Sequence, residues 1–457
     1  MSSTFSSSNE VFEWLSNFIN LERGQKPKSF RIDRMHALTE LAGNPQKCAP
    51  SIHIAGSKGK GSVTSMISAM LTAAGYRAAR YMSPHVTDIR ERICLGDSFF
   101  DEDIYCAAGG ELRAITDERL PAAIKLQPAL ASLFDSAKAD GCEPTFWELL
   151  TLLFFLCARQ AKCDVMVVET GMGGRLDSTN VLDPLVSVIT LIELEHTNFL
   201  GNSIAEVAGE KAGIIKKDKP LVLAKQCSEA LEVFKNKAQE MNSTLYYIPE
   251  TLLLSEIKIT KTGTEFNIKN NFLRGSVAPC EPLFLPIPGK VQAENAALAI
   301  TALKIAFPQI NEDAIRRGLA NLKIPARFEN IGKTLPFIID GAHTPESLDL
   351  CVETFCSLYG KDSMLIFGCA ADKDAAAMAR IAHSHFAKII ITTPGTFKAS
   401  DPAKVYEAFL QTAGKEKVSL VPDTQEAVKQ AQGFSLPILG TGSFYLAAEI
   451  REIVVLG

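Results

Sequence analysis

Short apolar runs alternate with segments of helical periodicity along almost the whole chain. In its first part the apolar runs cover residues 51–55, 165–169, 186–192 and 221–224. Segments with apolar positions at helical spacing lie between them, including residues 146–159 and 203–215. Ser203 followed three residues later by Glu206 is a capping box, which marks the start of the second of these helices. This alternation predicts an α/β domain in which helices cover a mostly parallel sheet.

A second series of apolar runs begins after Pro325, which follows a helical segment at residues 312–322. Its predicted strands are residues 337–340, 364–368, 388–392, 418–421 and 437–440. We therefore expect two domains, at residues 1–324 and 325–457. Between residues 252 and 277 polar and apolar positions alternate, which predicts an antiparallel addition at a sheet edge.

The turn between the first predicted strand and a helical segment is rich in glycine and lysine. It reads Gly56-Ser57-Lys58-Gly59-Lys60-Gly61-Ser62. Backbone N–H groups at a helix start point at a bound anion, glycines allow its close approach, and Lys60 would lie along the outer phosphates. The spacing is shorter than in most phosphate-binding loops, and a plain surface turn is the alternative for such a motif taken alone. With the strand pattern, the turn predicts a P-loop ATPase domain with a mostly parallel sheet, followed by a smaller Rossmann-like α/β domain.

Three further polar residues end apolar runs, where a parallel-sheet protein places its active site. Glu169 leads into a glycine-rich loop and is a candidate Mg²⁺ ligand, although such a residue can also cap a helix. His196 could join it, although a single histidine is more often structural. Ser83 precedes a proline, where serine commonly forms a turn. In the second domain, residues 340–343 and 442–445 also follow predicted strands. We expect them to form a polar rim on the opposite side of the site, called the second lip below.

Composition narrows the class of protein without identifying it. The chain has 457 residues, 47% hydrophobic and 22% charged, which is ordinary for a globular protein. A net charge of −5 argues against broad nucleic-acid binding. Its 11 cysteines include no Cys-x-x-Cys pair, the serine-rich start lacks a signal-peptide pattern, and the longest apolar run, residues 149–158, is too short to span a membrane. We expect a cytoplasmic protein with no membrane or nucleic-acid partner.

The ordered set of motifs resembles the folylpolyglutamate synthase/dihydrofolate synthase family of the Mur-ligase superfamily. The resemblance covers nearly the whole chain and is carried by residues 43–46, 52–62, 83–85, 90–93, 169–180, 196–201, 210–215, 292–297, 327–329, 340–343, 372–374 and 442–445. It implies an ATP-dependent ligase that adds L-glutamate to a folate or to dihydropteroate. In this family ATP phosphorylates the carboxylate, the glutamate amine attacks the acyl phosphate, and phosphate leaves. It further implies small-molecule substrates, one or two Mg²⁺ ions and a monomer.

The resemblance also assigns roles to individual residues. It places ATP against Gly56, Ser57, Lys58, Gly59, Lys60, Gly61, Ser62, Asn295, Arg327 and Asp340. It places Mg²⁺ on Ser83, Glu169 and His196, and the incoming glutamate or the folate against Arg90, His343, Ser443 and Tyr445. Trp147, at a helix start, is a candidate to flank the pteridine, with a core aromatic as the alternative. Lys60, Lys211 and His343 would be the catalytic residues. Lys211 matches the lysine that the family carbamylates, a change that turns a cation into a carboxylate-like anion, although the helix dipole alone would account for a lysine at this helix end.

The chain departs from the family pattern at four positions: Glu195 stands where aspartate is common, Val291 where histidine is frequent, Thr344 where asparagine is frequent, and Lys398 where arginine is usual. Two other functions remain open at this point. A Mur-type ligase for another carboxylate predicts a further N-terminal domain, whereas only 50 residues precede the first predicted strand. A P-loop switch protein predicts nucleotide hydrolysis that needs neither a carboxylate nor an amine.

Overall fold

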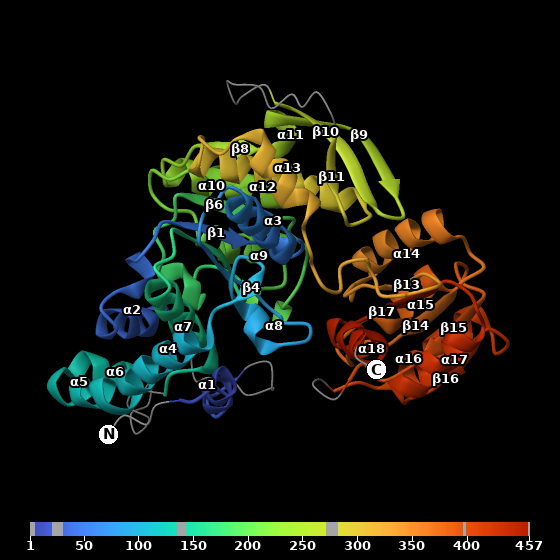
Figure 1. Cartoon of the computed structure of the whole chain (residues 1–457), viewed down its shortest axis with the longest axis horizontal. Coiled ribbons are helices and arrows are strands. Elements are labelled where there is room, and N and C mark those ends of the chain that lie inside the picture. Colours follow the sequence, from blue (N-terminus) through green and yellow to red (C-terminus); the bar gives the residue numbers. More distant parts are fainter. Residues whose placement is uncertain (1–4, 21–30, 135–142, 271–281, 396–398, 456–457) are drawn as a thin grey trace.

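Three β-sheets organise the chain. The computed structural model describes residues 5–20, 31–134, 143–270, 282–395 and 399–455. Its strands form sheets of eight, three and six strands. The eight-stranded sheet lies in the larger, blue-to-green part of the molecule, and the six-stranded sheet lies in the orange-to-red part beside it (Figure 1).

The largest sheet has the strand order β4-β3-β2-β5-β1-β6-β7-β8. The strands are β1 Ser51–Ala55, β2 Ala78–Tyr81, β3 Ile93–Leu95, β4 Ser98–Phe99, β5 Val165–Glu169, β6 Val186–Ile189, β7 Leu221–Leu223 and β8 Leu245–Tyr247. All neighbours pair in parallel except β3 and β4, which form an antiparallel edge. The carboxyl ends of β1, β2, β5 and β6 therefore meet at one edge of the sheet, as an active site of this fold class requires.

Helices cover both faces of this sheet, and the sequence of β5 explains why its strands are apolar throughout. Val165 and Val167 belong to one buried cluster, whereas Met166 and Val168 belong to another on the opposite face. The first cluster is completed by α3, α12 and α13, and the second by α1, α2, α4 and α7. The helices of this part are α1 Ser8–Leu15, α2 Ile32–Leu41, α3 Lys60–Ala73, α4 Glu102–Ala114, α5 Leu120–Leu126, α6 Pro128–Phe134, α7 Phe146–Gln160, α8 Thr197–Leu200, α9 Ile204–Ala212, α10 Ser228–Glu240, α11 Ile248–Thr251, α12 Lys290–Ala306 and α13 Glu312–Ala320.

The predicted strand at residues 186–192 ends earlier, at Ile189. The chain leaves the sheet there, and Leu191 contacts the glycine-rich turn instead. Its carbonyl oxygen accepts hydrogen bonds from the N–H groups of Ser57 and Lys58, at 2.9 and 3.1 Å. The end of β6 thus supports the glycine-rich turn rather than extending the sheet.

The antiparallel segment forms a sheet of its own rather than an addition to the edge of the large sheet. Strands β9 Leu252–Thr260, β10 Gly263–Asn270 and β11 Leu283–Leu285 pair in the order β11-β10-β9. Phe266 and Ile268 point from this sheet into the cluster shared with α3 and α12. The alternating pattern was therefore right about strand type and wrong about attachment; its residues 271–277 lie outside the described part of the chain.

The C-terminal sheet has the order β12-β13-β17-β14-β15-β16 and is parallel except for β12. Its strands are β12 Glu329–Asn330, β13 Phe337–Ile339, β14 Met364–Phe367, β15 Lys388–Ile391, β16 Val418–Leu420 and β17 Ile438–Thr441. Its helices are α14 Pro345–Tyr359, α15 Ala375–Ala382, α16 Pro402–Ala413, α17 Thr424–Gly433 and α18 Phe444–Val455. All five predicted strands of this part are present, within one or two residues of their expected ends.

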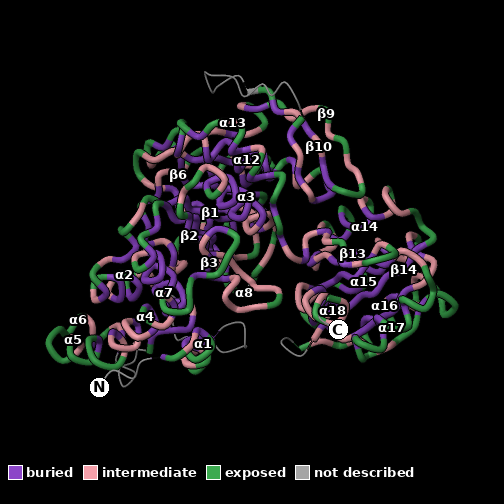
Figure 2. The backbone as a smooth tube through the Cα atoms, viewed as in Figure 1, coloured by how far each residue is buried: buried purple, intermediate pink, exposed green. Residues whose placement is uncertain are grey.

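Burial follows the sheets. Figure 2 shows the buried backbone concentrated along the strands and the helices packed on them, whereas few residues of the outer helices α5 and α6 are buried. No helix in the described part of the chain is both long and apolar enough to cross a membrane. The α/β fold with a mostly parallel sheet is thus confirmed.

Candidate functional site

A cavity of about 750 Å³ lies between the glycine-rich turn and the six-stranded sheet. Its walls come from both large sheets, from α2 and from the start of α7. The predicted site residues on its walls are Ser57, Lys58, Gly59, Lys60, Gly61, Ser83, Trp147, Glu169, His196, Arg327, His343, Ser443 and Tyr445. The structure therefore brings together residues that lie almost 400 positions apart in the sequence.

Two glycines of the turn are required by its shape. Gly56 has φ +145°, and a Cβ atom there would lie 1.8 Å from Thr190 Oγ1. Gly59 has φ +89°, and a Cβ atom there would lie 2.6 Å from Asn295 Oδ1. Gly59 caps α3, whose first residue is Lys60, without a side-chain hydrogen bond. The first N–H groups of a helix have no partner within it, so this cavity wall suits a phosphate.

Lysines and acidic residues surround the turn. Lys60 Nζ donates to the Gly56 carbonyl oxygen at 3.0 Å and lies 4.0 Å from Glu169 Oε1. Lys211 Nζ donates to the same carbonyl oxygen at 2.8 Å and pairs with Glu195 Oε1 at 3.0 Å. Burial lowers the pKa of Lys211 to about 8, against the opposing effect of Glu195. Burial would raise the pKa of Glu195, but the ammonium groups of Lys60 and Lys211 outweigh it and lower that pKa to about 2. Glu195 is thus a fixed negative charge under this turn.

The three predicted metal ligands, Ser83, Glu169 and His196, all line the cavity. Glu169 is 3% exposed, its Oε2 accepts from the Ser83 N–H at 3.3 Å, and burial raises its pKa to about 7 although Lys60 opposes the shift. His196 lines the cavity on its exposed side, with φ +51°. Among the described residues no three His, Cys, Asp or Glu side chains gather as a complete ligand set. One carboxylate with a serine beside it fits Mg²⁺, which keeps water and substrate phosphates as most of its ligands.

The second lip is built at the ends of β13 and β17. Asp340 accepts from the N–H groups of Phe328 and Ala342, both at 2.8 Å, and so holds together the two segments that carry Arg327 and His343. The Arg327 guanidinium lies 4.1 Å from the centre of the Phe444 ring. Burial raises the pKa of Asp340, and Arg327 opposes that shift. Asp340 supports this lip from behind and is not among the cavity-lining residues.

Four further predicted residues lie behind the walls of the cavity. Asn295 is buried in α12 directly against Gly59. Gly56 begins the glycine-rich turn, Lys211 donates to its carbonyl oxygen, and Ser62 lies in the first turn of α3; none of the four lines the cavity itself.

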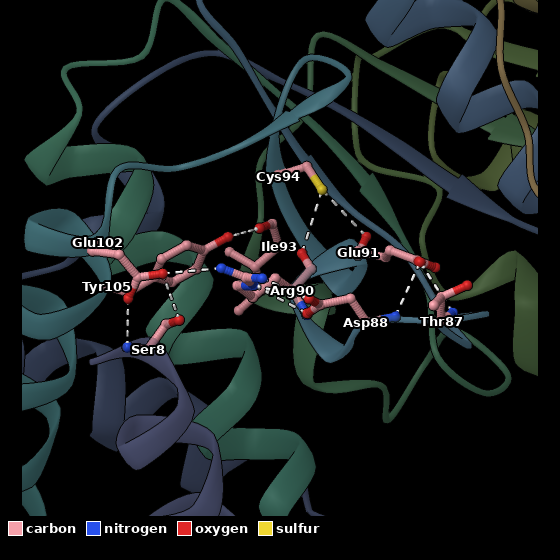
Figure 3. A network of polar contacts seen from close by, with 9 residues as sticks. All are labelled: Ser8, Thr87, Asp88, Arg90, Glu91, Ile93, Cys94, Glu102 and Tyr105. Carbon is pink, nitrogen blue, oxygen red and sulfur yellow. Dashed lines mark hydrogen bonds and ion pairs between the residues drawn. The ribbon is translucent and has the colours of Figure 1, made fainter. Parts of the chain in front are cut away.

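Arg90, expected to contact the substrate, is not among the residues that line the cavity. Figure 3 shows it in a network between β3, α4 and α1. Its guanidinium donates to Asp88 Oδ2 at 2.6 Å and to Glu102 Oε1 at 2.9 Å, and Glu102 also accepts from the Ser8 N–H at 2.7 Å. It also lies 4.3 Å from the centre of the Phe99 ring. With both carboxylates engaged, Arg90 ties these elements together, a structural role that the local sequence motif does not reveal.

The sequence did not predict a buried ion pair between Arg34 and Glu148, the residue after Trp147. Arg34 in α2 donates to Glu148 Oε1 and Oε2 at 2.9 and 2.6 Å, and both side chains line the cavity. Glu148 Oε2 also accepts from the N–H and hydroxyl of Thr145, at 2.7 and 2.8 Å, which closes a capping box at the start of α7. The Thr145-x-x-Glu148 spacing could have indicated the capping box. No local signal could have indicated a partner 114 residues away.

The departures from the family pattern have different surroundings. Glu195 forms the ion pair with Lys211, and Thr344 caps α14 by accepting from the Ser347 N–H. Val291 lies in the first turn of α12. Lys398 lies outside the described residues.

Comparison with known proteins agrees with this architecture. Residues 130–303 match the family described as the Mur ligase middle domain, and residues 326–436 match the Mur ligase, glutamate ligase domain. These two matches define the class of protein as a Mur ligase. Within that class, the chain belongs to the folylpolyglutamate synthase/dihydrofolate synthase family.

Curated relatives and solved structures support that family over the full chain. The dihydrofolate synthase/folylpolyglutamate synthase of Bacillus subtilis is 30% identical over 98% of this chain and 99% of its own. The folylpolyglutamate synthase of Lacticaseibacillus casei is 31% identical over 93% and 94%. The structure of Mycobacterium tuberculosis folylpolyglutamate synthase with ADP and AMPPCP has a TM-score of 0.85 at 28% identity, over 98% of both chains. A second solved structure, described as an FPGS–AMPPCP–folate complex (FPGS stands for folylpolyglutamate synthase), has a TM-score of 0.79 at 28% identity. The match covers 99% of this chain and 100% of that chain.

Proposed function

We propose that this protein is an ATP-dependent ligase that joins L-glutamate to the carboxyl group of a folate, of dihydropteroate, or of both, and releases ADP and phosphate. The observation that carries this proposal is the single cavity shared by the phosphate turn, Trp147 and the polar lip of the second sheet. The full-length similarity to folylpolyglutamate synthases supports the same activity. The relatives reported above carry folate-enzyme names, which favours a folate or dihydropteroate acceptor over another carboxylate.

The residues of the cavity suit carboxylate activation. A carboxylate becomes a useful acyl donor only when one of its oxygens leaves as phosphate, and that phosphoryl transfer develops negative charge. The first turn of α3 and the Lys60 ammonium lie where they would stabilise this charge. On the opposite wall, burial lowers the pKa of His343 to about 3, so its ring is neutral at physiological pH. We assign His343, Ser443 and Tyr445 to holding the incoming glutamate through hydrogen bonds, with Trp147 beside the pteridine ring.

We further propose that Ser83, Glu169 and His196 hold Mg²⁺ together with the ATP phosphates. The buried Glu169 carboxylate supports this assignment, because burial leaves its charge only partly compensated by Lys60. A bound Mg²⁺ would supply further neutralisation of the phosphate charge. We also propose a domain boundary at residues 324 and 325, closure of the two domains before chemistry, and a monomer. The separate sheets on either side of Pro325 support the boundary.

The substrate assay separates the candidate functions. Purified protein with ATP, Mg²⁺ and glutamate should release phosphate only after addition of dihydropteroate or a reduced folate. Activity with one acceptor would identify a monofunctional synthase, and activity with both a bifunctional one. Phosphate release that depends on neither acceptor would support a nucleotide-hydrolysing switch and refute the ligase.

We propose that Lys211 is carbamylated in the active enzyme. Its burial and its lowered pKa of about 8 support this, because only a neutral amine reacts with CO₂. The ion pair with Glu195 would have to open, since a carbamate carries a negative charge. Lys211→Ala should lose activity and partly regain it with a short carboxylate such as acetate, whereas the exposed Lys217→Ala should behave as wild type. Full activity of Lys211→Ala would exclude the carbamate, and a loss without rescue would favour Lys211 acting as a cation.

A further inference from the structure

The backbone of Lys58, in the glycine-rich turn (residues 56–62, also called the phosphate turn here), is held in place by a hydrogen bond. Its N–H donates to the Leu191 carbonyl oxygen at 3.1 Å, and the neighbouring Ser57 hydroxyl donates to the Glu193 carbonyl oxygen at 2.9 Å. The turn is therefore held on the segment that follows β6, and the direction in which the Lys58 side chain leaves the turn is set by the backbone.

The Lys58 side chain crosses the cavity to the other sheet. Its Nζ atom lies 3.4 Å from His343 Nε2, a contact between residues 285 positions apart. Lys60 takes the opposite direction, toward the Gly56 carbonyl oxygen and Glu169. The two lysines of one turn thus serve different walls: Lys60 the phosphate and metal wall, Lys58 the wall that we assign to glutamate.

The partners of His343 decide which atom donates in this contact. Its Nδ1 lies 2.8 Å from the Gly341 carbonyl oxygen, which can only accept. Nδ1 therefore carries the proton, and in a neutral ring Nε2 is left as an acceptor. The Lys58 ammonium donates to it. Burial, reinforced by the charge of Lys58, keeps the pKa of this ring low.

We propose that Lys58 is a positioning residue that orients His343 and sets the spacing between the phosphate turn and the amino-acid side of the cavity. This inference rests on the proposed function and deepens it. Amide formation brings an amine to an acyl carbon at about 3–3.5 Å, so a small error in the spacing of the two walls slows the reaction. A side chain that joins both walls directly is suited to set that distance.

The test compares Lys58→Met, which keeps the length of the side chain and removes its charge, with Lys58→Arg, which keeps a donor. In Lys58→Met the KM for glutamate should rise about tenfold or more, the loss expected for one charged hydrogen bond, while the Kd for ATP changes less than about threefold. Lys60→Met should show the reverse, with loss of ATP binding. If Lys58→Met does not fold, Lys58→Leu, which also lacks both the charge and the donor, takes its place.

A spectroscopic measurement separates positioning from general damage. With ¹⁵N-labelled histidine, assigned through His343→Gln, the wild-type ring should carry its proton on Nδ1. The Nε2 resonance should shift in Lys58→Met and stay near its wild-type position in Lys58→Arg. Lys217→Met is the matched control: it removes an exposed ammonium that does not line the cavity, so the His343 spectrum should not change.

Two results would overturn the proposal: an unchanged Nε2 resonance in Lys58→Met, or a rise in the ATP Kd as large as the rise in the glutamate KM. The second would make Lys58 one more phosphate ligand. Absence of ligase activity in the wild type would refute the proposed function instead, and the histidine spectra would still test the contact.

Discussion

At the scale of single residues, the phosphate turn shows how far a short motif can be interpreted. The sequence indicated glycines near a phosphate, and the structure gives the reason for two of them: positive φ at Gly56 and Gly59, with Thr190 and Asn295 directly behind. The separate tasks of Lys58 and Lys60 could not be predicted, because each depends on a partner from a distant part of the chain. Arg90 differs from both lysines, because its partners Asp88 and Glu102 lie only 2 and 12 positions away, yet its motif did not indicate that they would engage it.

Gly59→Ala should therefore weaken ATP binding, by about tenfold or more, because the new Cβ would push Asn295 and distort the turn. Gly75→Ala is its matched control. Gly75 has φ +90°, almost the same as Gly59, but a Cβ there would meet no atom within 4 Å. Both changes should cost about 1–2 kcal/mol of backbone strain. Isothermal titration with ATP should separate them, and wild-type affinity in Gly59→Ala would contradict this account of the turn.

At the scale of elements, strand and helix positions followed from local patterns, whereas their side-chain connections did not. The helix predicted at residues 203–215 is α9, capped by Ser203 and Glu206 as expected, but it ends at Ala212. Helix α7 starts at its predicted residue, Phe146. The ion pair that joins this helix to α2 could not be predicted from the sequence. A capping box lies within four consecutive residues and can be recognised in the sequence, whereas Arg34 and Glu148 are 114 positions apart.

The Arg34–Glu148 pair gives an element-scale prediction. Arg34→Met leaves a buried carboxylate without its cation, so the free energy of unfolding should fall by about 3–5 kcal/mol. Arg34→Met combined with Glu148→Met should lose clearly less than the sum of the two single changes. Urea unfolding of all four proteins measures this coupling. Additive losses would show that the two side chains act independently, and that the pair does not hold α2 against the start of α7.

At the scale of the whole molecule, the α/β class and the two series of strands were predictable because buried parallel strands are apolar throughout. The order of the strands was not, since β5 inserts between β2 and β1 after a long excursion through α4 to α7. The attachment of the three-stranded sheet was missed because alternation specifies one covered face but not what covers it. The cavity itself exists only through the approach of the two large sheets.

The central claim is that the protein transfers a phosphoryl group from ATP to the acceptor carboxylate, and that the glutamate amine then attacks the resulting acyl phosphate. The most direct measurement uses a folate or dihydropteroate acceptor labelled with ¹⁸O in both carboxylate oxygens, incubated with the full chain, ATP, Mg²⁺ and glutamate. We predict that mass spectrometry of the released phosphate finds one ¹⁸O atom for each amide formed, with the second retained in the amide carbonyl. Amide formation accompanied by phosphate without ¹⁸O would contradict the acyl-phosphate route and the arrangement of the site derived from it.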